Sequence, residues 1–126
     1  MRLLDTDVCV DIRRGYPPAL AWLAALTEAP GISGFVMLEL MRGCANQREM
    51  RRLQRDMALF RIHWPTVEDG ARALATYARA YLTHRLGILD VMIGENAVGL
   101  GATLCTFNVR HFRSVPGLTT EQPYGR

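Results

Sequence analysis

The chain has 126 residues, 49% of them apolar and 21% charged, which is typical of a single water-soluble globular domain. No apolar run approaches the ~20 residues of a membrane span, and no basic segment precedes a long apolar core, so we expect no signal peptide and a cytoplasmic location. The net charge is +3, and all 15 basic residues are arginines. This composition excludes mechanisms that need a lysine and suits a polyanion or an acidic peptide as partner.

The first third of the chain alternates short apolar runs with amphipathic stretches. The expected elements are a strand over Arg2–Asp5, a helix capped by Thr6 or Asp7 that ends near Gly15, a helix over Ala19–Leu26 started by Pro17 and Pro18, a strand at Ile32–Ser33, and a helix over Phe35–Arg42.

The same alternation continues to the C-terminus. The expected elements are a helix capped by Asn46 that runs to about Leu59, a strand over Arg61–Trp64, a helix over Val67–His84, a helix over Asp90–Val98 closed by Gly99 or Gly101, and strands over Thr103–Thr106 and Leu118–Glu121. Strands separated by helices predict an α/β fold whose parallel sheet is covered on both faces.

Several polar residues follow directly on predicted strands. Asp5 ends the first strand, Ser33 ends the second, and Thr106 and Asn108 come after the apolar strand near residue 104. Ligands of such folds gather at the carboxyl ends of the strands. We therefore expect these distant segments to converge on one edge of the sheet.

The three cysteines, Cys9, Cys44 and Cys105, are scattered along the chain. They form no C-x-x-C pair and no Cys/His spacing suited to zinc. We expect reduced, mostly buried thiols.

Three of the 12 acidic residues stand in unusually apolar surroundings. Asp5 follows Leu-Leu, Glu39 lies within FVMLELM, and Asp90 lies within GILDVMI. A carboxylate in such a setting is costly unless it is neutralised, paired or bound to a metal. A helix cap or an arginine partner would explain any one of them, whereas three together favour a shared site for Mg²⁺ or Mn²⁺, which prefer oxygen ligands.

Two known families have an opening motif like this one. Asp5-Thr6-Asp7-Val8 resembles the first motif of haloacid-dehalogenase-type phosphatases, D-x-D-x-[TV], with Ser33 in place of their second motif. That likeness implies a phosphatase with Asp5 as nucleophile and Asp7 as general acid. The family also uses a lysine, which this chain lacks, and usually paired acids near its end, where Asp90 stands alone.

The second resemblance spans almost the whole chain. Its blocks are LLDTDVCVDIRRG, SGFVMLELMRG and GILDVMIGENAVGLGATLCTFNVRHFRSVPGL. They resemble, in order and spacing, PIN-domain ribonucleases of the VapC toxin kind, whose last block contains T-x-[DN]-x-x-[DH]-F. The resemblance implies a single domain over residues 1–126 with a three-layer α/β/α fold and a mainly parallel sheet of four to five short strands.

The same resemblance implies the activity and the partners. It implies a Mg²⁺-dependent (or Mn²⁺-dependent) endoribonuclease toxin of a type II toxin–antitoxin system, which cleaves structured RNA and is neutralised by a cognate antitoxin. Asp5, Glu39 and Asp90 match the acidic metal-binding positions. Asn108 completes the catalytic set where many relatives have a fourth acid. Because Asn108 removes one negative charge, we expect at most one tightly bound ion in the free protein. Besides the ribonuclease and the phosphatase, a third hypothesis is a PIN-like module that has no catalytic activity and only binds a partner.

Four residues beside the acids are candidates for orienting carboxylates or waters: Thr6, Asp7, Ser33 and Thr106. The alternative role for Asp7 is to cap a helix. The alternative role for the three hydroxyl side chains is to form hydrogen bonds with the local backbone. Glu95 lies five residues after Asp90, so the two side chains diverge by about 140° on a helix. We expect a structural or antitoxin-facing role for Glu95 rather than metal binding.

The remaining polar and aromatic residues receive simpler interpretations. Asp11 is expected on a solvated face or paired with an arginine, and His111 and His63 are expected to be packing or surface histidines. An excess of apolar and aromatic side chains beyond one small core favours a homodimer, which becomes a heterotetramer or larger with antitoxin. The side chains that carry this expectation are Trp22, Phe60, Tyr77 and Tyr81.

Overall fold

A computed structural model describes all residues, 1–126, and contains six α-helices, a short 3-10 helix and five strands. The strands are β1 (Arg2–Leu4), β2 (Gly31–Ser33), β3 (Arg61–His63), β4 (Thr103–Cys105) and β5 (Thr119–Glu121). The helices are α1 (Thr6–Arg13), α2 (Pro17–Ala25), α3 (Gly34–Arg42), α4 (Gln47–Asp56), α5 (Val67–His84), α6 (Ile88–Leu100) and the 3-10 helix η1 (His111–Ser114).

The five strands form one fully parallel sheet in the order β3-β2-β1-β4-β5. Chain order therefore reverses beside the central strand β1, which pairs with β2 on one side and β4 on the other. The carboxyl ends of strands at such a switch point are where parallel α/β folds place their ligands. In this chain, the residues at that point are Asp5 after β1 and Thr106 after β4.

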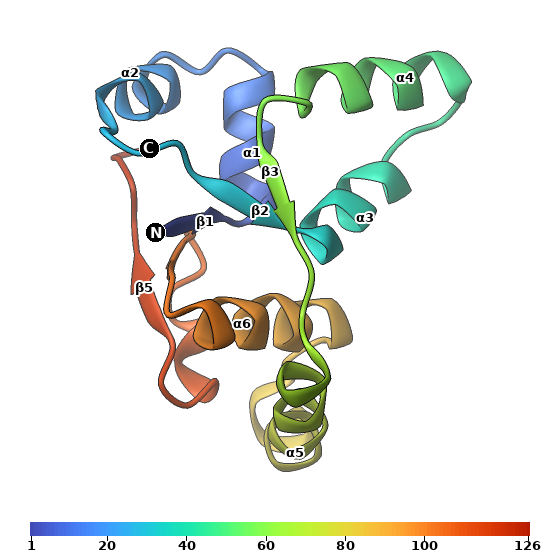
Figure 1. Cartoon of the computed structure of the whole chain (residues 1–126), viewed down its shortest axis with the longest axis vertical. Coiled ribbons are helices and arrows are strands. Elements are labelled where there is room, and N and C mark those ends of the chain that lie inside the picture. The colour runs from blue at the N-terminus through green and yellow to red at the C-terminus, as the bar shows by residue number, and fades with distance from the viewer.

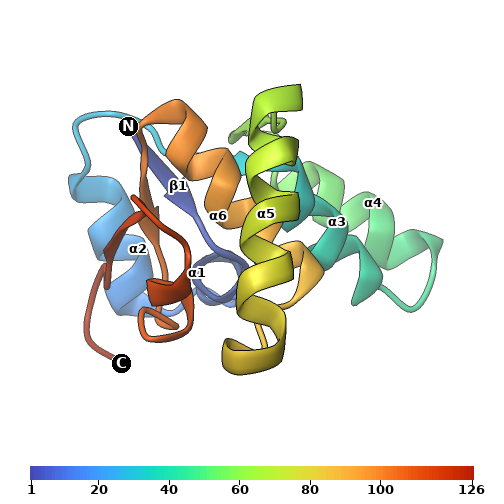
Figure 2. The same ribbon diagram turned by 90° about the horizontal axis from the view of Figure 1, so that it is seen from below.

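Helices cover both sides of the sheet, which gives the expected three layers (Figure 1). α1, α2 and α4 lie on one side, and α5 and α6 lie on the other, where they run against each other (Figures 1 and 2). Leu3, Leu4, Ile32 and Leu104 on the strands are completely buried between these layers. No helix combines the length and the apolar character needed to cross a membrane.

The predicted elements are present, with small differences at their ends. α4 ends at Asp56 rather than Leu59, and α6 begins at Ile88 and continues through Gly99 to Leu100. Gly101, in the left-handed region at φ 64°, ends α6. The predicted cap of α1 was wrong, because the cap is Asp5 itself, whose side chain accepts a hydrogen bond from the Thr6 amide.

The aromatic residues expected on an exposed face divide into two groups. Trp22, Phe60 and Tyr77 are partly buried and pack against the core. Tyr81 is 49% exposed and stacks on Tyr77 with ring centroids 5.0 Å apart. The cysteines are free, as expected, with Cys9 and Cys105 buried and Cys44 partly buried.

Candidate active site

Asp5 lies at the centre of the candidate site. It follows β1 directly, caps the N-terminus of α1 and retains only 7% of its exposure. Its Oδ1 accepts a hydrogen bond from the Thr6 amide at 2.8 Å, and its Oδ2 accepts one from the Thr106 hydroxyl at 2.7 Å. Pairing of β1 with β4 brings Thr106 to Asp5 across 101 positions of sequence. These two bonds fix the orientation of the carboxylate.

Asp7 supports the loop after β4. Its Oδ2 accepts a hydrogen bond from the Phe107 amide at 3.0 Å, and its Oδ1 accepts one from the Val8 amide at 2.8 Å. The hydroxyl of Thr106 accepts a further bond from the Asn108 amide at 3.0 Å. Asp7 thus holds the loop that carries Thr106 and Asn108, instead of capping α1 as one interpretation of the sequence had it.

Glu39 reaches the site from the middle of α3. One of its carboxylate oxygens accepts a hydrogen bond from the Thr6 hydroxyl. Its Oε2 lies 3.7 Å from Arg42, which is 72% exposed and therefore a weak partner. Thr6 links the two acids, because its amide bonds Asp5 and its hydroxyl bonds Glu39.

Asp90 lies in the first turn of α6, where the positive end of the helix dipole favours a carboxylate. Its Oδ2 lies 2.9 Å from Nε2 of His111, the first residue of η1. His111 is partly buried and packs edge-on against Phe112, as the sequence predicts, but it also pairs with Asp90, which the sequence does not predict. His111 lies three residues after Asn108, which places it near the site in the sequence. The sequence alone does not show which side chain His111 contacts.

Crowding of negative charge is evident at Asp5. Burial first, and then the charges of Asp7 and Asp90, raise the pKa of its carboxyl group from 3.8 to about 7, against the lowering effect of the Thr106 and Thr6 hydrogen bonds. Burial also raises the pKa of Asp7 above its ordinary value. No arginine or histidine forms an ion pair with Asp5. The Asp5 carboxylate thus lacks a protein cation to neutralise it.

The three predicted metal ligands lie around one edge of the sheet without converging on a single point. No three Asp, Glu, His or Cys side chains are arranged closely enough to hold an ion. Each acid instead contacts protein side chains near it. Asp5 and Glu39 accept hydrogen bonds from threonine, and Glu39 also lies near Arg42. Asp90 is paired with His111. The donor set, carboxylate and hydroxyl oxygens beside a buried charged group, fits a hard divalent cation.

Two further candidate residues play different parts. Ser33 is completely buried and caps α3 by accepting a hydrogen bond from the Phe35 amide at 3.2 Å, so it bonds local backbone and none of the acids. Asn108 is exposed, and its side chain forms no hydrogen bond. Its backbone carbonyl accepts the His111 amide at 3.1 Å and opens η1. The Asn108 side-chain amide is therefore available to bind a ligand.

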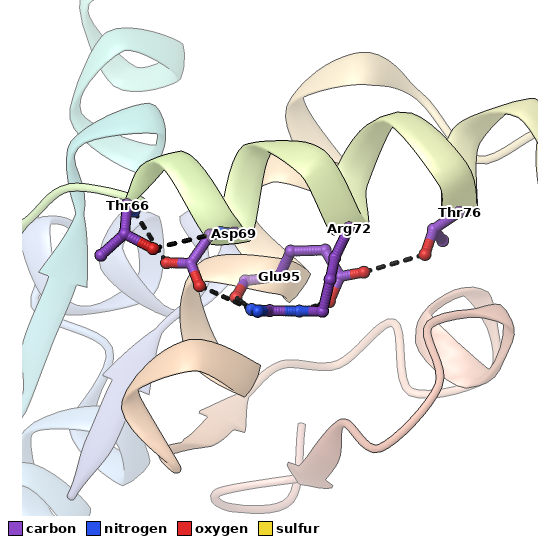
Figure 3. Close-up of polar contacts among 5 residues, drawn as sticks. All are labelled: Thr66, Asp69, Arg72, Thr76 and Glu95. Carbon is purple, nitrogen blue, oxygen red and sulfur yellow. Dashed lines mark hydrogen bonds and ion pairs between the residues drawn. The ribbon is translucent and has the colours of Figure 1, made fainter.

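Glu95 lies outside the site and joins α6 to α5 (Figure 3). It is 2% exposed, accepts a hydrogen bond from the Thr76 hydroxyl at 2.8 Å, and lies 3.4 Å from Nε of Arg72. Arg72 also contacts Asp69 at 2.5 Å, and Asp69 forms a capping box with Thr66 at the start of α5. The expected structural role is confirmed, and burial contradicts the antitoxin-facing alternative.

Asp11 forms the arginine pair that the sequence suggested. Its Oδ2 accepts hydrogen bonds from Tyr124 at 2.8 Å and Arg126 at 3.1 Å. Burial alone would raise the pKa of Asp11, but these two bonds bring it below its ordinary value. The Arg126 guanidinium also lies over the Phe107 ring, 4.1 Å from its centroid. The C-terminal residues thereby pack against α1 and the loop after β4.

Comparison with known proteins decides between the two families. The family model described as "PIN domain" matches residues 2–118. The chain belongs to the PIN-domain family. The alternative assignment to haloacid-dehalogenase-type phosphatases was wrong, because the match extends over nearly the whole chain rather than four residues.

Named relatives and solved structures agree with this assignment. The chain is 37% identical over 130 residues to "Ribonuclease VapC19" of Mycobacterium tuberculosis, covering 98% of this chain and all of the relative. A DNA-bound VapBC structure from Salmonella typhimurium has a TM-score of 0.81 at 21% identity, covering 95% of this chain and 96% of the other. A toxin–antitoxin complex from Klebsiella pneumoniae has a TM-score of 0.78 at 24% identity over both full chains. The PIN-like α/β/α fold is thus confirmed.

Proposed function

We propose that this PIN-domain protein is a metal-dependent endoribonuclease, the toxin of a toxin–antitoxin pair, and that it cleaves RNA at the edge of the sheet marked by Asp5. The observation that carries the proposal is the buried Asp5 carboxylate, whose pKa is raised to about 7 by burial and by the charges of Asp7 and Asp90, with no protein cation paired to it. The likeness to a relative named as a ribonuclease supports the same activity.

Asp5, Glu39 and Asp90 are the residues that would hold Mg²⁺ or Mn²⁺. The ion would supply the Lewis acidity for in-line hydrolysis of an RNA phosphodiester. Thr106 and Thr6 orient Asp5, and Thr6 also holds Glu39. The catalytic set is completed by Asn108, which is exposed and free of side-chain hydrogen bonds.

The substrate we propose is an exposed loop of structured RNA. A duplex has a regular backbone, whereas an unstacked loop can bend toward a recessed acidic site. The net charge of +3, carried by arginines alone, favours phosphate contacts that position such a strand.

The partners we propose are a cognate antitoxin and a second copy of the chain. Several α5 residues are apolar and exposed: Leu74 at 75%, Tyr81 at 49% and Leu82 at 84%. Large apolar side chains exposed along one helix are typical of interfaces. Light scattering at micromolar protein concentration should give the mass of a dimer, and a monomer with no tendency to associate would refute the homodimer.

Cleavage of a labelled RNA hairpin tests the proposed activity. The protein with Mg²⁺ should cut the loop, and both EDTA and the substitution Asp90→Ala should abolish cutting. Glu68→Ala is a matched control, because Glu68 is an exposed acid in the first turn of α5, away from the site. If folded Asp90→Ala protein cuts at the parental rate, the site is wrong. If the parental protein neither cuts RNA nor binds Mn²⁺ in calorimetry, the protein is the non-catalytic binding module instead.

A further inference from the structure

A cavity of about 500 Å³ opens beside the candidate active site, between α1, α3 and α4. Its volume lies within the range of ordinary ligand sites. Thr6 and Glu39 belong both to the candidate site and to the wall of this cavity. The cavity is therefore continuous with the place where we propose that RNA is cut.

Charged side chains dominate the wall. Six of the eleven lining residues are charged: Arg13, Arg14, Glu39, Glu49, Arg52 and Asp56. Most of these charged side chains already form ion pairs or hydrogen bonds within the protein. Arg13 lies 3.2 Å from Asp56, Glu39 contacts Thr6 and Arg42, and Glu49 accepts a hydrogen bond from the Ala45 amide at 3.1 Å.

Arg14 and Arg52 are the exceptions. Neither forms an ion pair, and both are exposed at the wall of the cavity. Arg14 is the C-cap residue of α1, while Arg52 shares one face of α4 with Glu49 and Asp56. Two guanidinium groups from different helices thus face one hollow without a carboxylate partner.

We propose that this cavity binds backbone phosphates of the RNA strand next to the cleavage site, through Arg14 and Arg52. The proposal rests on the ribonuclease function proposed above. Guanidinium groups bind phosphate oxygens bidentately, and such contacts fix the register of a strand without reading its sequence. A strand held here passes Thr6 and Glu39 as it leaves the cavity.

The composition of the wall favours RNA over a protein partner as occupant. The buried cores of protein–protein interfaces are depleted of charged residues, whereas nucleic-acid interfaces are polar and rich in cationic side chains. The wall has three arginines and three acids, and since Arg13 is paired with Asp56, Arg14 and Arg52 are the two cations left to bind phosphate. Val10, Leu40 and Cys44 supply the few apolar side chains of this wall. An apolar peptide segment would have little surface to cover here.

Binding without cleavage tests the proposal. A short fluorescein-labelled single-stranded RNA is titrated with the full-length protein in EDTA, and anisotropy gives the dissociation constant at several salt concentrations. Each lost phosphate contact lowers the salt slope by about 0.7, which is about fivefold in affinity at about 0.1 M salt. Arg14→Gln and Arg52→Gln should each weaken binding about fivefold, and the double variant about 25-fold.

Two further variants sharpen the test. Arg51→Gln is the matched control, because Arg51 is exposed on the same helix but does not line the cavity. It should change affinity less than either cavity variant. Asp56→Asn should act in the opposite direction and tighten RNA binding, since it removes a negative charge from the wall and frees Arg13.

The outcomes separate this proposal from the proposed activity. Equal weakening by Arg51→Gln and Arg52→Gln would overturn it, because the effect would then be one of net charge. It would also fail if the cavity variants bound the RNA normally and lost affinity only for a labelled oligoglutamate peptide, which would assign the cavity to an acidic protein. If the expected affinities appear but Mg²⁺ produces no cleavage, the cavity stands and the ribonuclease function fails.

Discussion

Replacing Asp5 by asparagine should make the metal-free protein more stable at neutral and alkaline pH. Asn is nearly the same shape but uncharged. The folded state holds the Asp5 proton more tightly than the unfolded state, because burial and neighbouring acids raise the pKa from 3.8 to about 7. Stability from this group is therefore fully present below about pH 4 and is lost as pH rises to about 7.

The size of the effect follows from the difference between the two pKa values. About three pH units at about 1.4 kcal/mol each give a loss of about 4 kcal/mol over the full range. Roughly 3 kcal/mol of this loss falls between about pH 5 and about pH 8. Asp5→Asn should remove that part of the pH dependence while abolishing RNA cleavage.

Urea unfolding in EDTA at the two pH values measures the free energy of unfolding for the parental protein and Asp5→Asn. Glu68→Gln is the control, because it removes the same charge from an exposed position. The reasoning is refuted if the parental protein and Asp5→Asn lose the same free energy of unfolding between these pH values. It also fails if Glu68→Gln behaves like Asp5→Asn.

Three other substitutions test separate parts of the structure. Asn108→Asp should tighten Mn²⁺ binding by about 1–2 kcal/mol if the side chain lies within ~4–6 Å of the ion; an unchanged dissociation constant in calorimetry would remove Asn108 from the site. His111→Leu should weaken Mn²⁺ binding on the order of tenfold by freeing Asp90, whereas His111→Gln, which keeps an N–H donor, should largely preserve it; equal affinities for the two variants would contradict a positioning role. Arg72→Met should lower the free energy of unfolding by about 3 kcal/mol, because it leaves the buried Glu95 carboxylate without its cation; chemical denaturation would contradict this if the variant were as stable as the parental protein.

Local patterns in the sequence predicted the order and type of the secondary-structure elements. Asn46 as the cap of α4 and the long α5 from Val67 to His84 are examples where the prediction and the structure agree. Such features depend on residues within a few positions of each other, so spacing alone reveals them. The ends of α4 and α6 were less well predicted, because tertiary packing decides where a helix stops.

The acids of the site could be recognised from their apolar neighbours and from the family's motifs, but their partners could not. Thr106 bonds Asp5 only because β4 lies next to β1, and local hydrophobic periodicity does not specify that order of strands. Glu95 shows the same limit. The spacing of Glu95 and Asp90 on one helix predicted that their side chains point in different directions. The burial of Glu95 against Arg72 and Thr76, however, depends on how α5 packs on α6.

The sequence by itself thus determined the kinds of charge available: arginines without lysines, and carboxylates at strand ends and helix starts. Only the tertiary structure decided which charges meet. It paired His111 with Asp90 and placed Arg14 and Arg52, 38 positions apart, on one cavity. The physical reason is that electrostatic and hydrogen-bond energies depend on distance in space, which for residues far apart in sequence is set by the packing of helices on the sheet.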